Sequence, residues 1–337
     1  MTREPPLALT RGDPSGVGPE IALKAWAALR RAPDAPVFFI AAEAAPLRAL
    51  AQRLGLDAPV EQIGAAREAH DIFARALPVL DPGGAVSGAP GAPDPRDAEA
   101  TIASIRTCVD LVARGEAAAV VTNPIAKEVL YRAGFAHPGH TEFLAALAEP
   151  LAGRRLTPVM LLWSPELAVV PATIHIPLKD VPARLTRALL IETGAIVAQD
   201  FRDRFGLAAP RLAFAGLNPH AGEGGAMGHE DQEIVAPAVA ALRAAGIEAS
   251  GPHPADTMFH ARARAAYDVA IGMYHDQALI PIKTLAFDHG VNVTLGLPFV
   301  RTSPDHGTAF DIAGRGVADA SSLIAALRLA AKLAAAS

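Results

Sequence analysis

The chain has 337 residues, 51% hydrophobic and 19% charged, which excludes a disordered protein and provides for about two domains. Thirty Lys and Arg against 35 Asp and Glu give a formal net charge of −5, which argues against a general nucleic-acid binder. A single cysteine, Cys108, excludes an internal disulfide and a cysteine-rich zinc site, and it fits a reducing cytoplasm. The sequence shows no secretory signal and no run of about 18 apolar residues, so we expect a cytoplasmic protein without a membrane span.

Short apolar runs alternate with amphipathic helical patterns from the N-terminus onward. In the first half the predicted strands are 7–10, 37–40 and 117–122, and the predicted helices are 20–31, 44–54, 98–114, 125–133 and 141–149. In the second half the predicted strands are 159–163, 167–172, 212–216, 269–273 and 291–295, and the predicted helices are 181–199, 230–245 and 321–335. Residues 82–95 hold eight Gly or Pro in fourteen and predict a loop. This alternation predicts an α/β fold with a largely parallel sheet.

Three histidines each follow a predicted apolar strand. They are His175 after LAVVPATI, His220 after RLAFAGLNP and His275 after YDVAIGMY. Ligands of open α/β sheets bind at the carboxyl ends of strands, so these imidazoles could share one divalent metal ion. The alternative is that each is an isolated polar residue of a loop. Asp256 and Asp276 are the best candidates for a carboxylate that orients such a ligand or relays a proton.

A second set of residues is cationic and polar. His140 and Thr141 stand at the start of a predicted helix, where Thr141 is a candidate N-cap and free N–H groups could bind an anion. Lys283 and Arg301 could supply the countercharge for a phosphate or carboxylate, and Asn292 lies between them in the sequence. The alternative is a plain helix cap and surface residues.

Neither glycine-rich loop carries a dinucleotide-binding signature. GDPSGVGPE lacks the GxGxxG spacing and the Lys-Ser/Thr of a P-loop, and NPHAGEGGAMGHED has Met227 at the place of the third glycine. Neither loop therefore supports a Rossmann assignment.

Taken together, several motifs resemble those of the 4-hydroxythreonine-4-phosphate dehydrogenase family of pyridoxal phosphate biosynthesis. The motifs are GDPSGVGPE, VTNPIAKEVLYRAG, PGHTEFLA, TIHIPLKDV, GLNPHAGEGG, GPHPADTMF, YHDQALIPIK and TLGLPFVRTSPDHGTAFDIAG, and they run from Leu7 to about Ala330. The resemblance implies a two-domain fold like that of isocitrate and isopropylmalate dehydrogenases, mostly parallel with helices on both faces. We expect an outer domain of residues 1–136 and 300–337, and an inner domain of 137–299 that carries the metal site and the dimer interface. The implied protein is a homodimer whose active site lies between the domains and is completed by the partner subunit.

The resemblance also implies roles for the two sets of residues. The metal ligands would be His175, His220 and His275; the substrate contacts would be His140, Thr141, Lys283, Asn292 and Arg301. The implied reaction is oxidation of 4-phosphooxy-L-threonine at C3 by NAD⁺ or NADP⁺ with one divalent ion (zinc, magnesium or cobalt), followed by loss of carbon dioxide. Asp256, Asp276 or Lys283 would help to remove the hydroxyl proton.

Other functions stay open at this point. Relatives that act on phosphorylated threonate or erythronate, or on a cis-dihydrodiol, would share the same motifs. Three histidines with an open metal position also describe a zinc hydrolase that activates water. A phosphate- or metal-binding protein without catalytic activity is a further alternative.

Overall fold

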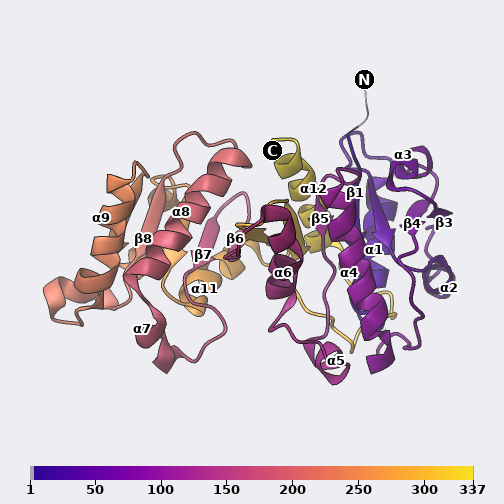
Figure 1. Cartoon of the computed structure of the whole chain (residues 1–337), viewed down its shortest axis with the longest axis horizontal. Helices are drawn as coiled ribbons and strands as arrows, with labels where there is room; N and C mark the ends of the chain where they lie inside the picture. The colour runs from indigo at the N-terminus through magenta and orange to yellow at the C-terminus, as the bar shows by residue number, and fades with distance from the viewer. Residues whose placement is uncertain (1–3, 337) are drawn as a thin grey trace. The chain divides into compact units, whose positions relative to one another are not determined.

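The structure, a computed structural model, describes residues 4–336 and falls into two compact units (Figure 1). Unit 1 runs up to Pro158 and includes Leu297–Ala335, and unit 2 is essentially Val159–Gly296. Residues 137–158, which we expected in the inner domain, pack with unit 1 because Phe143 and Leu144 belong to its hydrophobic core. Within the described residues no helix has the length and apolar character needed to cross a bilayer.

The sheet of unit 1 is parallel throughout, in the strand order β3-β4-β2-β1-β5-β12. Its strands are β1 (Leu7–Thr10), β2 (Phe38–Ala41), β3 (Val60–Ile63), β4 (Leu77–Leu80), β5 (Val120–Val121) and β12 (Arg301–Pro304). Every residue of β1 and β2 is buried, which explains their continuous apolar sequences, because helices cover both faces of a parallel sheet.

Helices pack on this sheet from two sides. They are α1 (Gly18–Leu29), α2 (Ala44–Leu54), α3 (Ala69–Ile72), α4 (Ala98–Ala113), α5 (Lys127–Arg132), α6 (His140–Ala152) and α12 (Ser321–Ala334). Figure 1 shows α4 and α6 on the side of the unit 1 strands that faces the viewer. Cys108, on α4, is fully buried in the core shared with Phe39 and Phe143, so its side chain serves packing. Burial also raises the pKa of its thiol.

The sheet of unit 2 is mixed, in the order β11-β6-β7-β10-β8-β9. Its strands are β6 (Val159–Trp163), β7 (Ala168–Pro171), β8 (Leu212–Ala215), β9 (Ala249–His253), β10 (Val269–Gly272) and β11 (Val291–Leu295). β7, β10, β8 and β9 run parallel, whereas β6 is antiparallel to both β7 and β11. The helices are α7 (Val181–Arg184), α8 (Arg187–Asp203), α9 (Ala236–Ala244), α10 (Ala261–Arg264) and α11 (His275–Ala286).

The predicted fold class, α/β with mostly parallel strands in two parts, is confirmed. The predicted helix over 181–199 is wrong in extent. The chain is extended at Leu185, and Thr186 begins α8 by accepting a hydrogen bond from the N–H of Leu189 at 3.1 Å. No helix is predicted over 275–286. Pro281 argues against a helix there, yet it lies inside α11.

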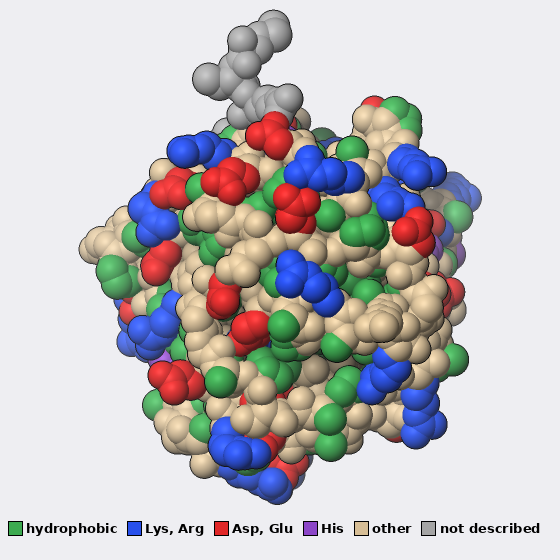
Figure 2. Space-filling view, turned by 90° about the vertical axis from the view of Figure 1, so that its right-hand side faces the viewer, with side chains coloured by type: hydrophobic (Ala, Val, Ile, Leu, Met, Phe, Trp, Pro, Cys, Tyr) green, Lys and Arg blue, Asp and Glu red, His purple; other side chains and the backbone are tan. Residues whose placement is uncertain are grey.

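The face of the molecule drawn in Figure 2 carries Lys and Arg side chains interspersed with Asp and Glu, without a large area of one sign. This distribution agrees with the formal charge of −5 and gives no electrostatic reason to expect nucleic-acid binding on that face.

Candidate active site

The three predicted metal ligands follow three neighbouring parallel strands of unit 2. β10 lies between β7 and β8, with Ile271 opposite both Val170 and Phe214. His175 follows β7, His220 follows β8, and His275 begins α11 directly after β10. The carboxyl ends of parallel strands meet at one edge of a sheet, so all three histidines belong to the same edge of unit 2.

His175 and His275 come together. Their ring centroids are 5.6 Å apart with an angle of 43° between the ring planes. His275 Nδ1 lies 2.7 Å from Asp276 Oδ1, and that hydrogen bond leaves Nε2 as the ring nitrogen that a metal ion could use. Two imidazoles, one of them held by a carboxylate, are a donor set that suits zinc, cobalt or another first-row divalent ion.

His220 lies in an unusual turn that forms η4 (Pro219–Gly225). Three non-glycine residues of this turn have left-handed backbone angles, with φ of 54° at His220, 53° at Ala221 and 43° at Glu223. The fully buried carboxylate of Asp231 supports the turn, accepting from the N–H of Leu217 at 2.7 Å and from that of Asn218 at 3.1 Å. These two hydrogen bonds to Asp231 hold the loop that precedes His220 in place.

The structure does not bring all three histidines into one coordination shell. Among residues 4–336 no three side chains of His, Cys, Asp or Glu are arranged to hold a metal ion. The observed pair is His175 with His275, and His220 does not complete a three-residue metal group with them. Asp276 contacts the pair through His275, whereas Asp256 is an exposed residue of the short helix η6 (Ala255–Thr257).

The side chains of Arg301 and Lys127, together called the cationic group, lie in unit 1 near the end of β5. Arg301, the first residue of β12, is only 4% exposed and donates to Thr122 Oγ1 from Nη2 at 2.6 Å and from Nε at 3.1 Å. Burial lowers the pKa of Arg301 to about 10, so the guanidinium stays protonated at neutral pH. A desolvated guanidinium is a strong binding group for phosphate or carboxylate.

His140, the first residue of α6, lies within electrostatic range of Arg301 and Lys127. Its Nε2 is buried without a hydrogen-bond partner. Burial, and then the charges of Arg301 and Lys127, hold the pKa of His140 well below its usual value, so the imidazole is neutral near pH 7. A methyl group added at Gly139 would lie 3.3 Å from Lys127 Nζ, which places the Lys127 ammonium against the start of the helix.

Two sequence expectations change here. Thr141 is not the N-cap of α6, because the cap is Gly139 and Thr141 is the second helical residue. Lys127 was missed, although VTNPIAKEV already placed a lysine just beyond a strand end. Its proximity to Gly139 depends on the chain between α5 and α6, which no local pattern reveals.

Lys283 and Asn292 lie in unit 2. Lys283 is in the last turn of α11, with Nζ 5.5 Å from the ring centroid of Phe287. Asn292 is the second residue of β11, opposite Leu162 of β6. The predicted substrate contacts are therefore divided, with His140, Thr141 and Arg301 in unit 1 and the other two in unit 2.

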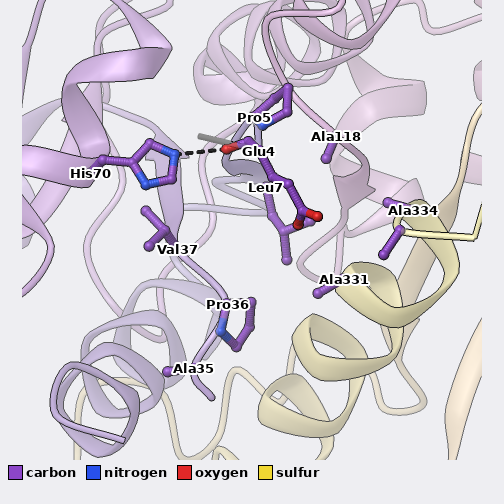
Figure 3. A pocket seen from close by; sticks show the side chains of 11 residues that line it. Glu4, Pro5, Leu7, Ala35, Pro36, Val37, His70, Ala118, Ala331 and Ala334 are labelled. Atoms are coloured by element: carbon purple, nitrogen blue, oxygen red, sulfur yellow. Dashed lines mark hydrogen bonds between the residues drawn. The ribbon is translucent and has the colours of Figure 1, made fainter. Parts of the chain in front are cut away.

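The cavity shown in Figure 3 is a different feature. It has a volume of about 370 Å³ and is lined by residues that include Leu7, Val37 and Ala118, which begin or precede β1, β2 and β5. Figure 3 shows His70 pointing toward the Glu4 carbonyl. The distance from His70 Nε2 to the Glu4 carbonyl oxygen is 2.9 Å. The cavity is thus at the amino ends of the strands, and none of its lining residues is a candidate site residue.

The neutral state of His140 predicts an acid-sensitive contribution to stability. The folded-state pKa of His140 is lowered, so the unfolded chain binds more protons as pH falls below about 6.5 and the free energy of unfolding decreases. We expect His140→Gln to lose less stability than the parent between pH 7.5 and pH 5.5 in urea unfolding. His306→Gln, at an exposed histidine of unit 1, is the control, and an identical loss in H140Q and the parent would contradict the expectation.

Comparison with known proteins confirms the resemblance found in the sequence. The family model described as pyridoxal phosphate biosynthetic protein PdxA matches residues 34–330. A protein of Methylorubrum populi named 4-hydroxythreonine-4-phosphate dehydrogenase is 64% identical, over 98% of this chain and 94% of the relative.

Solved structures agree with this match. The crystal structure of 4-hydroxythreonine-4-phosphate dehydrogenase from Klebsiella pneumoniae superposes with a TM-score of 0.86 at 38% identity, covering 98% of this chain and 99% of that one. A terephthalate 1,2-cis-dihydrodiol dehydrogenase from Burkholderia xenovorans gives a TM-score of 0.65 at 28% identity, covering 98% of both chains.

Proposed function

The chain belongs to the PdxA family of pyridoxal phosphate biosynthetic proteins, and from this membership we propose that it oxidises 4-phosphooxy-L-threonine at C3, with NAD⁺ or NADP⁺ as the acceptor. The observation that carries the proposal is the 64% identity, over nearly the whole chain, to a relative named for this activity. In this reaction C3 loses a hydride to the nicotinamide, and its hydroxyl loses a proton. The product, 2-amino-3-oxo-4-phosphooxybutanoate, is a β-keto acid and loses carbon dioxide to give 3-amino-2-oxopropyl phosphate.

The histidines of unit 2 are the proposed metal ligands. His175 and His275 are already paired, and His220 would have to join them when the ion binds. A divalent ion such as zinc, magnesium or cobalt would supply Lewis-acid catalysis at the alcohol oxygen of the substrate. Asp276 fixes the orientation of the His275 ring through its hydrogen bond to Nδ1, which keeps Nε2 directed away from the carboxylate.

The cationic group of unit 1 is the proposed binding site for the substrate phosphate. Arg301 and Lys127 provide charge, and the start of α6 with Thr141 provides backbone N–H groups. Neutral His140 carries one ring N–H, so it can donate one hydrogen bond to the phosphate without becoming protonated. Binding the phosphate, which does not react, fixes the position of C3 and so converts binding energy into orientation.

Polar groups of unit 2 complete the proposed residue roles. Lys283 and Asn292 would contact the polar groups of the substrate. We assign removal of the hydroxyl proton to one of Asp256, Asp276 and Lys283. Full turnover across pH in all three single alanine variants would rule this assignment out.

The glycines of the β1–α1 loop do not indicate which residues would bind the nicotinamide. A methyl group added at Gly12 would lie 2.6 Å from the Pro124 carbonyl oxygen, and one at Gly18 would lie 2.9 Å from the Arg11 carbonyl oxygen. These glycines are therefore required for packing, and we assign no residue of the loop to the cofactor.

We also propose that the protein is a homodimer that associates through unit 2. Large apolar side chains are exposed there, with Leu178 at 67%, Ile280 at 64% and Phe287 at 73%. Ile280 lies on α11, the helix that begins with His275, and Phe287 is its C-cap; the two are seven positions apart and so project on about the same side. Light scattering under assay conditions should give the mass of two chains, and the mass of one chain would contradict the proposal.

The activity can be tested directly on the purified chain. We expect reduced nicotinamide to accumulate when NAD⁺ or NADP⁺ is mixed with 4-phosphooxy-L-threonine, and a chelator should stop the reaction until a divalent ion is restored. Phosphorylated threonate, phosphorylated erythronate and a cis-dihydrodiol complete the panel, because the dihydrodiol dehydrogenase neighbour favours that second activity. No cofactor reduction with any of them would overturn the proposal, and metal-dependent hydrolysis instead would identify a zinc hydrolase.

A further inference from the structure

We propose that Gln277 and Thr173 are positioning residues that set the spacing of the three histidines by tying their loops to the backbone of Met273. This inference rests on the proposed metal role of His175, His220 and His275. Neither residue touches the metal in this scheme, and each acts through the loop that it holds.

The side-chain amide of Gln277 joins two loops. Its Oε1 accepts from the N–H of Met273 at 2.6 Å, within the segment that leads from β10 into α11 and His275. Its Nε2 donates to the carbonyl of Gly216 at 2.8 Å, in the segment that leads from β8 to His220. Gln277 therefore connects the His275 helix to the His220 loop through one rigid amide group.

The hydroxyl of Thr173 joins the third loop to the same point. Thr173 Oγ1 donates to the carbonyl of Met273 at 2.8 Å, and Thr173 is only 6% exposed. Thr173 lies between β7 and His175, so this bond connects the His175 loop to the end of β10. The neighbouring backbone bond from Ala172 N–H to the Gly272 carbonyl, at 2.8 Å, reinforces the connection.

Met273 is thus a backbone junction for the three loops. Its N–H serves the Gln277 bond, its carbonyl serves the Thr173 bond, and its side chain is fully buried. The Thr173 bond is buried and the two Gln277 bonds are partly buried, and such bonds are costly to leave unmade. This junction therefore holds the starts of the three loops together, so the movement that brings His220 to the pair is confined to the turn beyond Gly216. A metal site needs its ligands held to within about half an ångström of the productive geometry. Loss of either bond should therefore weaken metal binding more than it weakens the fold.

The test measures metal binding as well as activity. Full-length, metal-stripped protein is titrated with Co²⁺ by calorimetry, and the Tm of the metal-free protein is recorded in parallel. We expect Gln277→Met and Thr173→Val, which keep side-chain size and remove the hydrogen bonds, to weaken Co²⁺ binding by about 10- to 100-fold. Thr173→Ser restores the hydroxyl and should restore wild-type affinity.

A matched control is Gln199→Met on α8, where the amide donates to Asp203 at 2.7 Å on the exposed side of the helix. Wild-type Co²⁺ affinity in both Q277M and T173V would overturn the inference while leaving the metal proposal in place. An equal fall in T173S and T173V would also overturn it, because the effect would not follow the hydroxyl. Failure of the parent protein to bind Co²⁺ would overturn the proposed metal role itself.

Discussion

Replacing His275 with alanine is expected to abolish metal-dependent turnover and leave the fold intact. The side chain is 37% exposed and begins α11, so its removal creates no core cavity. It does remove half of the imidazole pair with His175. A catalytic metal contributes several kcal/mol to transition-state stabilisation, so we expect kcat to fall by a factor of about 10³ or more. The measurement is steady-state cofactor reduction at saturating Zn²⁺ or Co²⁺, with bound metal quantified in the same samples.

The matched control is His289→Ala. His289 is also a partly exposed histidine of unit 2, and its Nε2 bonds to Glu166 at 3.2 Å rather than to another imidazole. We expect this variant to bind metal and turn over as the parent does. If H275A still bound one equivalent of metal with unchanged affinity and rate, His275 would not be a ligand, and the site proposed here would have to be abandoned.

The pairing of His175 with His275 shows how far topology can be read from a sequence. Both residues follow apolar runs that were predicted as strands, and parallel neighbours place such residues at one edge. His220 follows a correctly predicted strand as well, yet it does not join the pair. The difference lies in the turn. His175 itself has a left-handed φ of 50°, but it is a single residue, whereas His220, Ala221 and Glu223 all have left-handed φ within one turn and together set the course of the chain. Non-glycine residues give no local signal for such angles.

The cationic group of unit 1 was harder to predict because it is assembled from polar segments that are distant in sequence. The sequence of β12, RTSP (301–304), has no apolar pattern and predicts no strand, but all four of its residues are buried. They are tolerated because Thr122 accepts from Arg301, and Thr302 Oγ1 donates to the Ala326 carbonyl at 2.9 Å. The neutral state of His140 results first from burial and then from the charges of Arg301, which is distant in the sequence, and Lys127. Composition and spacing identified these residues as candidates, but only the packed structure reveals their electrostatics.

Replacing Arg301 with methionine should lower kcat/KM by about 10²- to 10³-fold, chiefly through a higher KM. Loss of a buried charged hydrogen-bonding group from a binding site costs about 2–5 kcal/mol, and the guanidinium here is 4% exposed. Methionine preserves much of the buried volume, so the loss falls mainly on anion binding rather than on packing. Arg301→Lys should give an intermediate effect because it keeps the charge but cannot donate from two nitrogens to one side.

A binding measurement separates recognition from chemistry in these variants. Inorganic phosphate should inhibit the parent competitively against the phosphorylated substrate, and its inhibition constant should rise in R301M along with KM. Arg132→Met, at an exposed arginine of α5 that pairs with Glu128, is the control and should change neither constant. An R301M variant with normal KM and normal phosphate inhibition would show that the buried guanidinium serves only the structure, through its bonds to Thr122. The phosphate would then have to be bound elsewhere, with Lys283 on α11 the next cation to test.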